Sequence, residues 1–486
     1  MYGRQAQESY RISPFHLFAF IGVAFYIAWL MLQYLNPLLT SPELAPDSKG
    51  IGPHLLFFVS TPLALVAAWG CSNRLSTPQG LRALVAVGIL LAPLVSLGPY
   101  FIPANSAALA ATLWALSGIG YAALLMLWTT VLVTLEGHRV ILFLAAAAGA
   151  GAALFVFVLA LVDSATFLFT ALMPVLSALF FLISFRFRHL LPLENTELLS
   201  VSAADSDGKD PVSPSIIADS LSYAVCLGVG IWYALHELAY PANIICIGAA
   251  CALACILMFV DALRFRVFTE KLQLKLFLPL AALTVFPLSF LSPPVTYVFV
   301  FLLFVAFVPS LLSNYGSASE CIRVFELSPL RVFAYGRAWC ILGALAGYLF
   351  AAYAFRGPWA AGNGVLLGFC ALFALFILAA TCLLRDHYPT SSEVKEDDDL
   401  ELAPSEMFRD SLSERTEVVA GRFGLSPRQS EVLHLLAKGR NTSYIQEHLV
   451  ISHYTAKAHI YNIYQKMGIH SRQDLLNLIE QVELGN

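Results

Sequence analysis

The chain of 486 residues is 58% hydrophobic and 12% charged, with a mean hydropathy of +0.73. Soluble domains are about 45–50% apolar and about 25% charged, so this composition excludes an ordinary soluble protein and indicates one that spans a membrane. Charge is uneven: residues 392–417 carry a net charge of −7, whereas residues 418–486 carry +2. The sequence therefore divides into a hydrophobic body, an acidic connector and a mildly basic tail.

The hydrophobic body contains apolar runs long enough to cross a bilayer as helices, which takes about 20 residues for about 30 Å of hydrocarbon. The first run begins near residue 15 and has no small-residue cleavage site after a short core, so it is interpreted as a span and not as a signal peptide. Twelve spans are predicted, as six plus six: 15–36, 52–70, 81–101, 107–134, 139–162 and 165–187, then 216–236, 241–263, 274–292, 295–314, 331–354 and 362–384. They form a predicted membrane domain over residues 1–389, with the polar segment 188–215 as a loop between its halves.

The positions of lysine and arginine predict the orientation, because these residues favour the cytoplasmic side of membrane proteins. With the N-terminus inside, sixteen of the eighteen Lys and Arg residues before residue 392 fall in cytoplasmic segments. Only Lys49 and Arg356 fall in outward loops. The pattern predicts a multi-pass protein of the cytoplasmic membrane with both termini in the cytoplasm.

Two groups of six spans around a central loop resemble the major facilitator superfamily, whose transporters are built from repeated halves. The resemblance is architectural and covers roughly residues 15–385. That family usually has a loop rich in Gly, Asp and Arg between its second and third spans. Here the loop is Gly70-Cys71-Ser72-Asn73-Arg74-Leu75, with Asn73 where an Asp is expected. The resemblance therefore implies the family's fold more firmly than it implies transport.

Ionisable residues inside a membrane domain are candidates for function, because burying a charge in hydrocarbon is costly. The predicted ligand contacts are His236, Glu237 and Arg337, which lie near the ends of predicted spans. The alternative is that these side chains anchor helix ends at the interface or form ion pairs in loops. No chain of buried acids indicates a proton relay, which disfavours a proton-coupled pump.

Residues 390–417 follow the last predicted span and include the run Glu396-Asp397-Asp398-Asp399. Such a run is typical of a solvated, extended linker. A second interpretation is that the acidic segment repels DNA, or shields the basic side of the following domain until a signal arrives.

Residues 418–486 have the pattern of a small domain of four helices. Ser426 and Pro427 suit the cap and the first position of a helix, and Gly439 is a stop signal. The buried side of this helix is predicted to be Val432, Leu433, Leu435 and Leu436. A second helix is expected from about Thr442, a third over about 453–467 after a turn at 450–452, and a fourth over about 471–484.

Motifs at fixed offsets across about 60 residues are the most specific signal in the chain. They are Leu425-Ser426-Pro427-Arg428, Glu431-Val432-Leu433, Leu436-Ala437-Lys438-Gly439, Ile445, Glu447, Ile451-Ser452, Thr455-Ala456-Lys457-Ala458-His459, Asn462-Ile463, Lys466-Met467-Gly468 and Ser471-Arg472. Together they closely resemble the LuxR-type helix-turn-helix family. The resemblance implies sequence-specific DNA binding, with the third helix in the major groove.

The predicted DNA contacts lie on the third helix and form two groups. Lysine can donate to guanine edges, alanine can meet a thymine methyl group, and Tyr or Gln can reach bases or phosphates. That group consists of Lys457, Ala458, Tyr461 and Gln465. The second group is predicted to contact phosphates or to brace the helix, and consists of Thr455, His459, Asn462 and Lys466. Ordinary helix surface is the alternative for each residue.

A net charge of only +2 over residues 418–486 predicts weak DNA binding by a single copy, because affinity grows with the number of phosphates neutralised. Members of the LuxR family usually dimerise through the fourth helix, so the resemblance implies a homodimer. In this chain that helix offers Leu475, Leu476, Leu478, Ile479 and Val482, which cover more than one narrow face.

These patterns together predict a membrane-embedded, one-component transcription regulator, in which a small molecule sensed by the membrane domain controls DNA binding. The alternative is a major-facilitator-type transporter with an attached tail that binds DNA or a protein. The sequence contains no phosphate-binding loop, catalytic arrangement or metal-ligand spacing, so neither enzyme activity nor a cofactor or metal is expected. The expected partners are DNA, membrane lipid and a small-molecule ligand.

Overall fold

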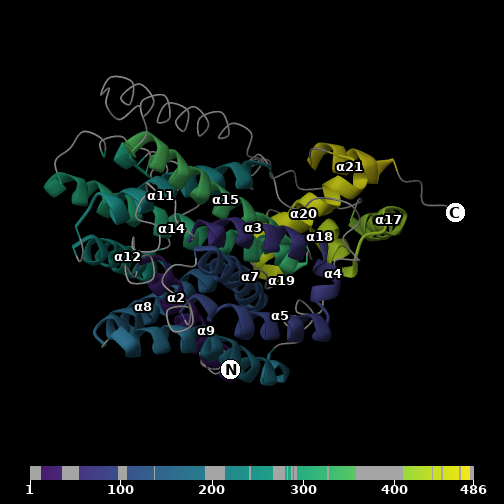
Figure 1. Ribbon diagram of the computed structural model, residues 1–486. Coiled ribbons are helices and arrows are strands. Elements are labelled where there is room, and N and C mark those ends of the chain that lie inside the picture. Colours follow the sequence, from purple (N-terminus) through teal and green to yellow (C-terminus); the bar gives the residue numbers. More distant parts are fainter. Residues whose placement is uncertain are drawn as a thin grey trace. The chain divides into compact units, whose positions relative to one another are not determined.

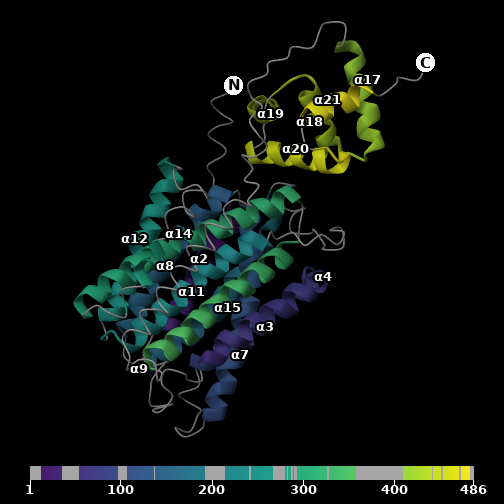
Figure 2. The same ribbon diagram turned by 90° about the horizontal axis from the view of Figure 1, so that it is seen from above.

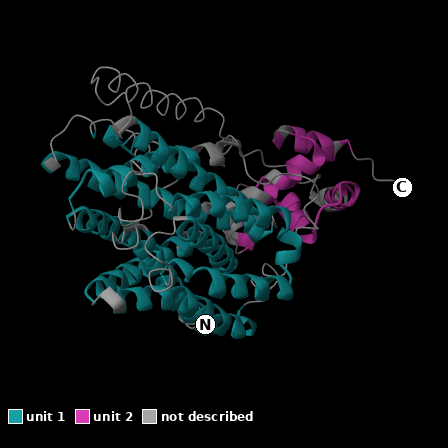
Figure 3. Ribbon diagram, in the orientation of Figure 1, with its two compact units in different colours: residues 1–386 teal, residues 387–486 magenta. Residues whose placement is uncertain are grey.

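The computed structural model describes residues 13–35, 54–96, 107–135, 137–161, 163–191, 214–239, 242–265, 280–281, 283–285, 288, 293–325, 328–356, 409–440, 442–449, 453–469 and 472–481. Within these residues every regular element is a helix, which confirms the all-α prediction. The chain separates into two compact units, residues 1–386 and residues 387–486 (Figure 3).

The first half of unit 1 is a group of apolar helices (Figure 1). They are α2 (Pro14–Leu35), α3 (Leu55–Gly70), α4 (Ser72–Leu75), α5 (Pro78–Leu91), α7 (Ala107–Leu132), α8 (Gly137–Leu159), α9 (Asp163–Arg186) and the short turn η2 (Arg188–Leu190). Helix α2 packs against α8 and α9, whereas α3 and α5 pack against α7. The start of α5 is fixed locally, because the Thr77 hydroxyl accepts a hydrogen bond from the Gly80 N–H at 3.1 Å.

The described helices of the second half of unit 1 are α11 (Pro214–His236), α12 (Ala242–Val260), the π-helical turn η4 (Asp261–Phe265), α14 (Pro293–Phe325) and α15 (Pro329–Arg356). Helix α11 packs along α15, and α12 packs along α14. Glycines bring the backbones of α11 and α15 into contact. A Cβ atom at Gly347 would overlap the carbonyl oxygen of Val225, and one at Gly228 would overlap that of Ala344. Small residues at a crossing let helices of membrane proteins approach in this way.

Among the described helices, the two halves of unit 1 contact each other along two seams. Helix α3 packs against α15, and Figure 2 shows the two side by side; α8 packs against α12 and α14. Hydrogen bonds join the halves near opposite ends of the helices. The hydroxyl of Tyr348 and Nε2 of His54 are hydrogen-bonded at 3.0 Å. The Ser319 hydroxyl lies 3.2 Å from the carbonyl oxygens of both Leu132 and Leu135.

Unit 1 has the surface of a membrane protein. Within its described residues, eight helices are long and apolar enough to cross a bilayer, and α3 and residues 220–236 are shorter apolar helices. Large apolar side chains are exposed on the outside, for example Leu63 at 65%, Leu90 at 67% and Ile245 at 66%. So much exposed apolar surface is unfavourable in water, whereas lipid covers it without cost. The protein is therefore a multi-pass membrane protein.

The predicted spans agree with the described helices in most places, but two of them are not tested. Spans 274–292 and 362–384 lie mostly or wholly outside the described residues, so the total of twelve stays a prediction. Helix α14 continues to Phe325, beyond the predicted end at 314. Ser319, which lies beyond the predicted end, is fully buried and hydrogen-bonded to backbone carbonyls of the first half.

Unit 2 contains α17 (Arg409–Arg422), α18 (Pro427–Ala437), α19 (Thr442–Leu449), α20 (His453–Met467) and α21 (Arg472–Glu480). These helices enclose a separate apolar core. Its fully buried members are Val419, Val432, Leu433, Ile445, Ala456, Ile463 and Leu475. The third predicted helix, 453–467, coincides with α20.

Helix α17 is a difference from the sequence prediction. Residues 390–417 were expected to form an extended linker, but α17 begins at Arg409, so the end of that range is helical. Helix α17 packs against α18 and α21, and Thr416 and Val419 are buried at 3% and 0% exposure. The Thr416 hydroxyl is hydrogen-bonded to Nδ1 of His434 at 3.2 Å. Helix α17 is stabilised by its contacts with α18 and α21, which follow it in the sequence. The acidic composition of residues 390–417 gives no sign of these contacts, and for that reason an extended linker was predicted.

Candidate DNA-binding helix and inter-half cavity

Local sequence fixes the start and end of α18. The Ser426 hydroxyl accepts a hydrogen bond from the Gln429 N–H at 3.3 Å, and Oε1 of Gln429 accepts one from the Ser426 N–H at 3.0 Å. This reciprocal pair is a capping box, which satisfies two backbone donors that have no partner inside the helix. Past the other end, Gly439 has a φ of 81°, a conformation that favours glycine.

Helix α20 buries one stripe of side chains in the core of unit 2. Its buried residues are Ala456, Ile460, Ile463 and Met467, which recur at helical spacing and pack into the core of unit 2. Four predicted DNA contacts belong to α20 but have side chains outside the described residues: Thr455, Lys457, Ala458 and Tyr461. They stay predictions. Gln465 is exposed, and His459 and Asn462 are half-buried.

Lys466 joins the end of α20 to the start of α18. Its Nζ donates to the carbonyl oxygen of Gly424 at 2.8 Å and to Oε1 of Gln429 at 2.9 Å. These contacts are those of a bracing residue, one of the two roles that the sequence left open. A phosphate contact by Lys466 stays a prediction.

Two arginines that were not among the predicted site residues hold the helices of unit 2 together. Nη2 of Arg428 donates to the carbonyl oxygen of Leu449, the last residue of α19, at 2.6 Å. Nη2 of Arg472 donates to the carbonyl oxygen of Leu436, near the end of α18, at 3.3 Å. Terminal carbonyls of helices have no partner within the helix and carry partial negative charge, so arginine stabilises them. Both arginines belong to the LuxR motifs, which indicated that they matter. The motifs did not reveal their partners, because these lie far away in the sequence.

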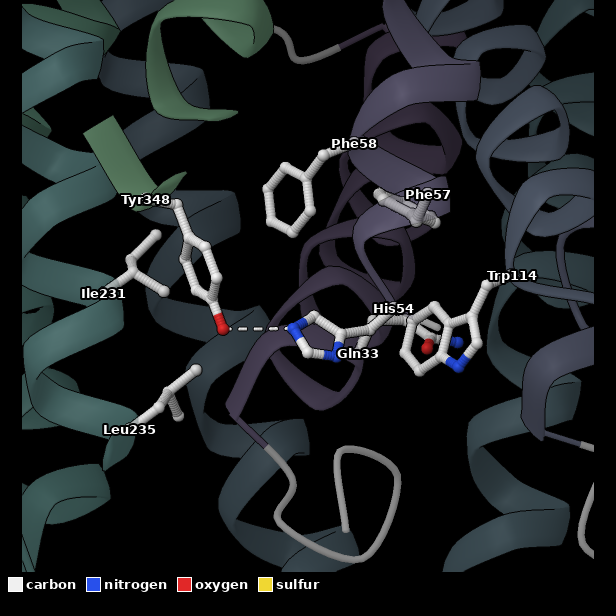
Figure 4. Close-up of a pocket in the computed structure, with 8 residues that line it drawn as sticks. All are labelled: Gln33, His54, Phe57, Phe58, Trp114, Ile231, Leu235 and Tyr348. Atoms are coloured by element: carbon white, nitrogen blue, oxygen red, sulfur yellow. Dashed lines mark hydrogen bonds between the residues drawn. The ribbon is translucent and has the colours of Figure 1, made fainter. Parts of the chain in front are cut away.

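A cavity lies between the two halves of unit 1 (Figure 4). Its empty volume, open mouth included, is about 340 Å³. The first half contributes Gln33, His54, Phe57, Phe58 and Trp114, and the second half contributes Ile231, Leu235 and Tyr348. The hydrogen bond between His54 and Tyr348 crosses this space from one half to the other.

The structure places one of the predicted ligand residues beside this cavity. The ring of His236 stacks on Trp232 at 5.0 Å between centroids and meets the ring of Tyr348 edge-on at 6.0 Å. Glu237 is exposed at the end of α11. Arg337 is on α15, roughly three helical turns from Tyr348, or about 16 Å along the axis. The structure therefore does not bring Arg337 together with His236.

Arg337 is the centre of a separate polar cluster. It is 5% exposed, and its Nη2 donates to Oδ1 of Asn314 at 2.9 Å. Nδ2 of Asn314 donates to the hydroxyl of Ser220 at 2.8 Å. The guanidinium carbon lies 3.7 Å from the centroid of the Tyr315 ring. Among the residues that the structure describes, these partners of Arg337 are all uncharged.

Comparison with known families decides the nature of unit 2. The family of bacterial regulatory proteins named luxR matches residues 424–479. These residues are a LuxR-family DNA-binding domain. The match covers α18, α19, α20 and most of α21, and it leaves α17 outside the family's common part.

Comparison with solved structures identifies the fold of unit 1. A structure of the major facilitator superfamily proton:xylose symporter XylE, bound to 6-bromo-6-deoxy-D-glucose, matches with a TM-score of 0.52. The match covers 77% of this chain and 95% of the symporter chain, at 13% sequence identity. Unit 1 therefore has a fold like that of the major facilitator superfamily. No curated protein matches the chain.

The LuxR-family domain is expected to lose stability in mild acid through His459. Burial, and then the positive charge of Arg428, lower the pKa of this imidazole. The unfolded chain has a histidine pKa of about 6.5, so below that pH the unfolded state binds a proton that the folded state resists. Thermal unfolding of residues 387–486 should therefore shift to lower temperature between about pH 7.5 and about pH 5.5. His459→Gln should reduce that shift in unfolding temperature. The control, His448→Gln, changes an exposed histidine and should leave the shift as it is in the wild type. Equal shifts in the two variants would contradict the assignment of the pH dependence to His459.

Proposed function

We propose that this protein is a one-component transcription regulator of the cytoplasmic membrane, with both termini in the cytoplasm. One observation carries the proposal: a single chain joins a LuxR-family domain to a membrane domain of the major facilitator fold. The LuxR-family domain binds DNA through α20, so the target promoter is bound at the membrane surface. The distribution of Lys and Arg supports this orientation.

The membrane domain is the sensor in this proposal. Hydrogen bonds of the described residues join its halves, among them Tyr348 with His54 and Ser319 with Leu132. A small molecule that binds between the halves and favours one arrangement of them shifts the population toward that arrangement. His236, Glu237 and Arg337 remain proposed ligand contacts, of which His236 lies nearest to the inter-half cavity.

The LuxR-family domain acts as a homodimer in this proposal. Leu475 and Ile479 of α21 are buried in the domain's own core, whereas Leu476 and Leu478 are half-buried. Leu478 also packs against that core, so Leu476 is the described apolar side chain of α21 that a second copy would cover, while Val482 lies outside the described residues. A dimer doubles the number of phosphates that are neutralised, which offsets the low charge of a single copy.

The alternative function is a transporter with an attached regulatory tail. The fold of unit 1 agrees with it, but a match at 13% identity carries no information about a transported substrate. The LuxR-family domain favours regulation.

Lys457→Ala is expected to weaken binding to target DNA about tenfold or more, because a lysine contact to a guanine edge contributes about 1–3 kcal/mol of discrimination. Target fragments would be recovered by mapping the chromatin bound to the full-length protein in cells. The purified full-length variant would then be tested for retardation of those fragments.

Lys438→Ala is the matched control, since it removes the same charge from the exposed end of α18. We expect the Lys438→Ala variant to bind the same DNA fragments as the wild type and to give the same transcript profile in cells. If both variants bound the fragments as the wild type does, sequence-specific binding through α20 would be contradicted.

A further inference from the structure

We propose that the end of α9 and the neighbouring start of α5 bind the head group of an anionic phospholipid. The site consists of three exposed arginines, Arg82, Arg186 and Arg188, which we call the arginine cluster. The inference goes beyond the proposed function, because it depends on the membrane domain alone. In the proposed orientation the site lies in the cytoplasmic leaflet.

The outward surface of α9 changes from apolar to cationic at its end. Leu179, Leu182 and Ile183 are exposed, and Arg186 follows them at helical spacing, so the four side chains form one stripe. Lipid acyl chains cover the apolar part of such a stripe, and lipid phosphates lie just outside the hydrocarbon. The guanidinium of Arg186 therefore lies at the level of the phosphate groups.

The turn after α9 holds Arg188 in a fixed position. Residues Arg188–Leu190 form the 3-10 turn η2, and the ring of Phe187 stacks on that of Phe18 in α2 at 5.5 Å between centroids. The guanidinium carbon of Arg188 lies 5.2 Å from the centroid of the Phe185 ring. A contact of this kind orients a guanidinium without neutralising its charge. Arg188 is thus positioned for an anion before one binds.

The protein itself does not use the charges of the arginine cluster. At the end of α9 other groups satisfy the carbonyl oxygens: Nδ1 of His189 donates to that of Arg186 at 3.1 Å, and the Leu191 N–H donates to that of Arg188 at 3.1 Å. None of the three arginines pairs with a carboxylate of a described residue. A guanidinium has five N–H donors and binds phosphate oxygens in pairs. A phosphate group would therefore supply the missing anion.

Helix α5 adds the third arginine at the same end. It packs against α9, and Figure 1 shows the two side by side. Among the described membrane helices of the first half, α5 is the third and α9 the sixth, so they run in opposite directions. Arg82, near the start of α5, is thus on the same side of the membrane as Arg186.

The surroundings of the cluster favour a lipid over a soluble phosphate. Leu182 and Ile183 on α9 and Leu90 on α5 are exposed, and acyl chains bury such side chains whereas a phosphate ion does not. The head group and the chains of one phospholipid would thus occupy the cationic and the apolar parts of the same surface. Arginines next to a membrane attract anionic lipids for the same electrostatic reason.

Phosphatidylglycerol and phosphatidylcholine with the same acyl chains test the proposal, because they differ in net charge. Each lipid would be titrated into the full-length protein in detergent, and its half-maximal concentration for raising the unfolding temperature would be measured. We expect that concentration to be about tenfold lower for phosphatidylglycerol. Inorganic phosphate should not stabilise the protein. Equal concentrations for the two lipids, or stabilisation by inorganic phosphate alone, would overturn the proposal.

Paired substitutions locate the lipid. The double variant Arg186→Ala and Arg188→Ala should lose most of the preference for phosphatidylglycerol, whereas Arg186→Lys and Arg188→Lys, which retain the charges, should keep most of it. The readout is the ratio of the two half-maximal concentrations in one variant, so it remains valid if the variant is less stable than the wild type.

Arg264→Ala is the matched control. Arg264 is also an exposed arginine at the end of an apolar helix, but it follows Asp261 by three residues. We expect this variant to keep the full preference for phosphatidylglycerol. An unchanged preference in the double alanine variant would refute the site. An equal loss in Arg264→Ala would show general attraction between cationic ends and anionic lipids, which also contradicts a site at α9.

Discussion

Gly347→Ala is expected to destabilise the membrane domain by about 3 kcal/mol, although it adds a single methyl group. The new Cβ would overlap the carbonyl oxygen of Val225 on α11. The obstructing atom belongs to the backbone, so no flexible side chain can move to relieve the overlap. The helices would have to separate along the whole crossing, where Gly228 and Gly343 also face backbone atoms of the opposite helix. Thermal unfolding of the full-length protein in detergent measures the effect.

Gly336→Ala is the control for this substitution. Gly336 lies on the same helix, α15, but nothing lies within 4 Å of the position that its Cβ would take. We expect it to unfold at or slightly above the wild-type temperature, because alanine favours a helix over glycine by about 1 kcal/mol. Similar behaviour of the two variants would show that the backbone contact between α11 and α15 does not support the fold.

Ile463→Ala is expected to lower the stability of the LuxR-family domain by about 2–5 kcal/mol and so to weaken DNA binding. Ile463 lies in the middle of α20 and is fully buried in the core of unit 2. Truncating a buried isoleucine costs about 2–5 kcal/mol, because apolar contacts are lost and a cavity remains. The total stability of a small domain is about 5–15 kcal/mol, so the loss is a large part of it. Chemical denaturation of residues 387–486 measures the change directly.

Val418→Ala is the matched control in the same unit. It also truncates an apolar side chain, but Val418 is 49% exposed on α17, so we expect a change of about 0.5 kcal/mol or less. A wild-type unfolding midpoint for Ile463→Ala would mean that α20 is not packed on this core. Loss of DNA binding without loss of stability would instead give Ile463 an unexpected role at the DNA.

The sequence by itself determined what depends on local pattern. Ser426 and Gln429 are three residues apart, so their capping box required no tertiary information. The start of α20 followed from the turn predicted at 450–452, and the LuxR motifs identified the family because their offsets are fixed within about 60 residues. Membrane spans were found by length and hydropathy, which are also local quantities.

The tertiary structure decided what depends on contacts between distant segments. Helix α17 is helical because α18 and α21 cover it, although its sequence is polar. Lys466 braces the start of α18 through Gln429, which is 37 residues away. The residues that line the cavity could not be assigned from the sequence, because those that the structure describes carry no carboxylate, guanidinium or ammonium group, whereas intramembrane charges were the main sequence signal. His54 and Tyr348 are 294 residues apart, and no local pattern relates them. Their contact exists only because α3 and α15 pack together, which a linear sequence does not show.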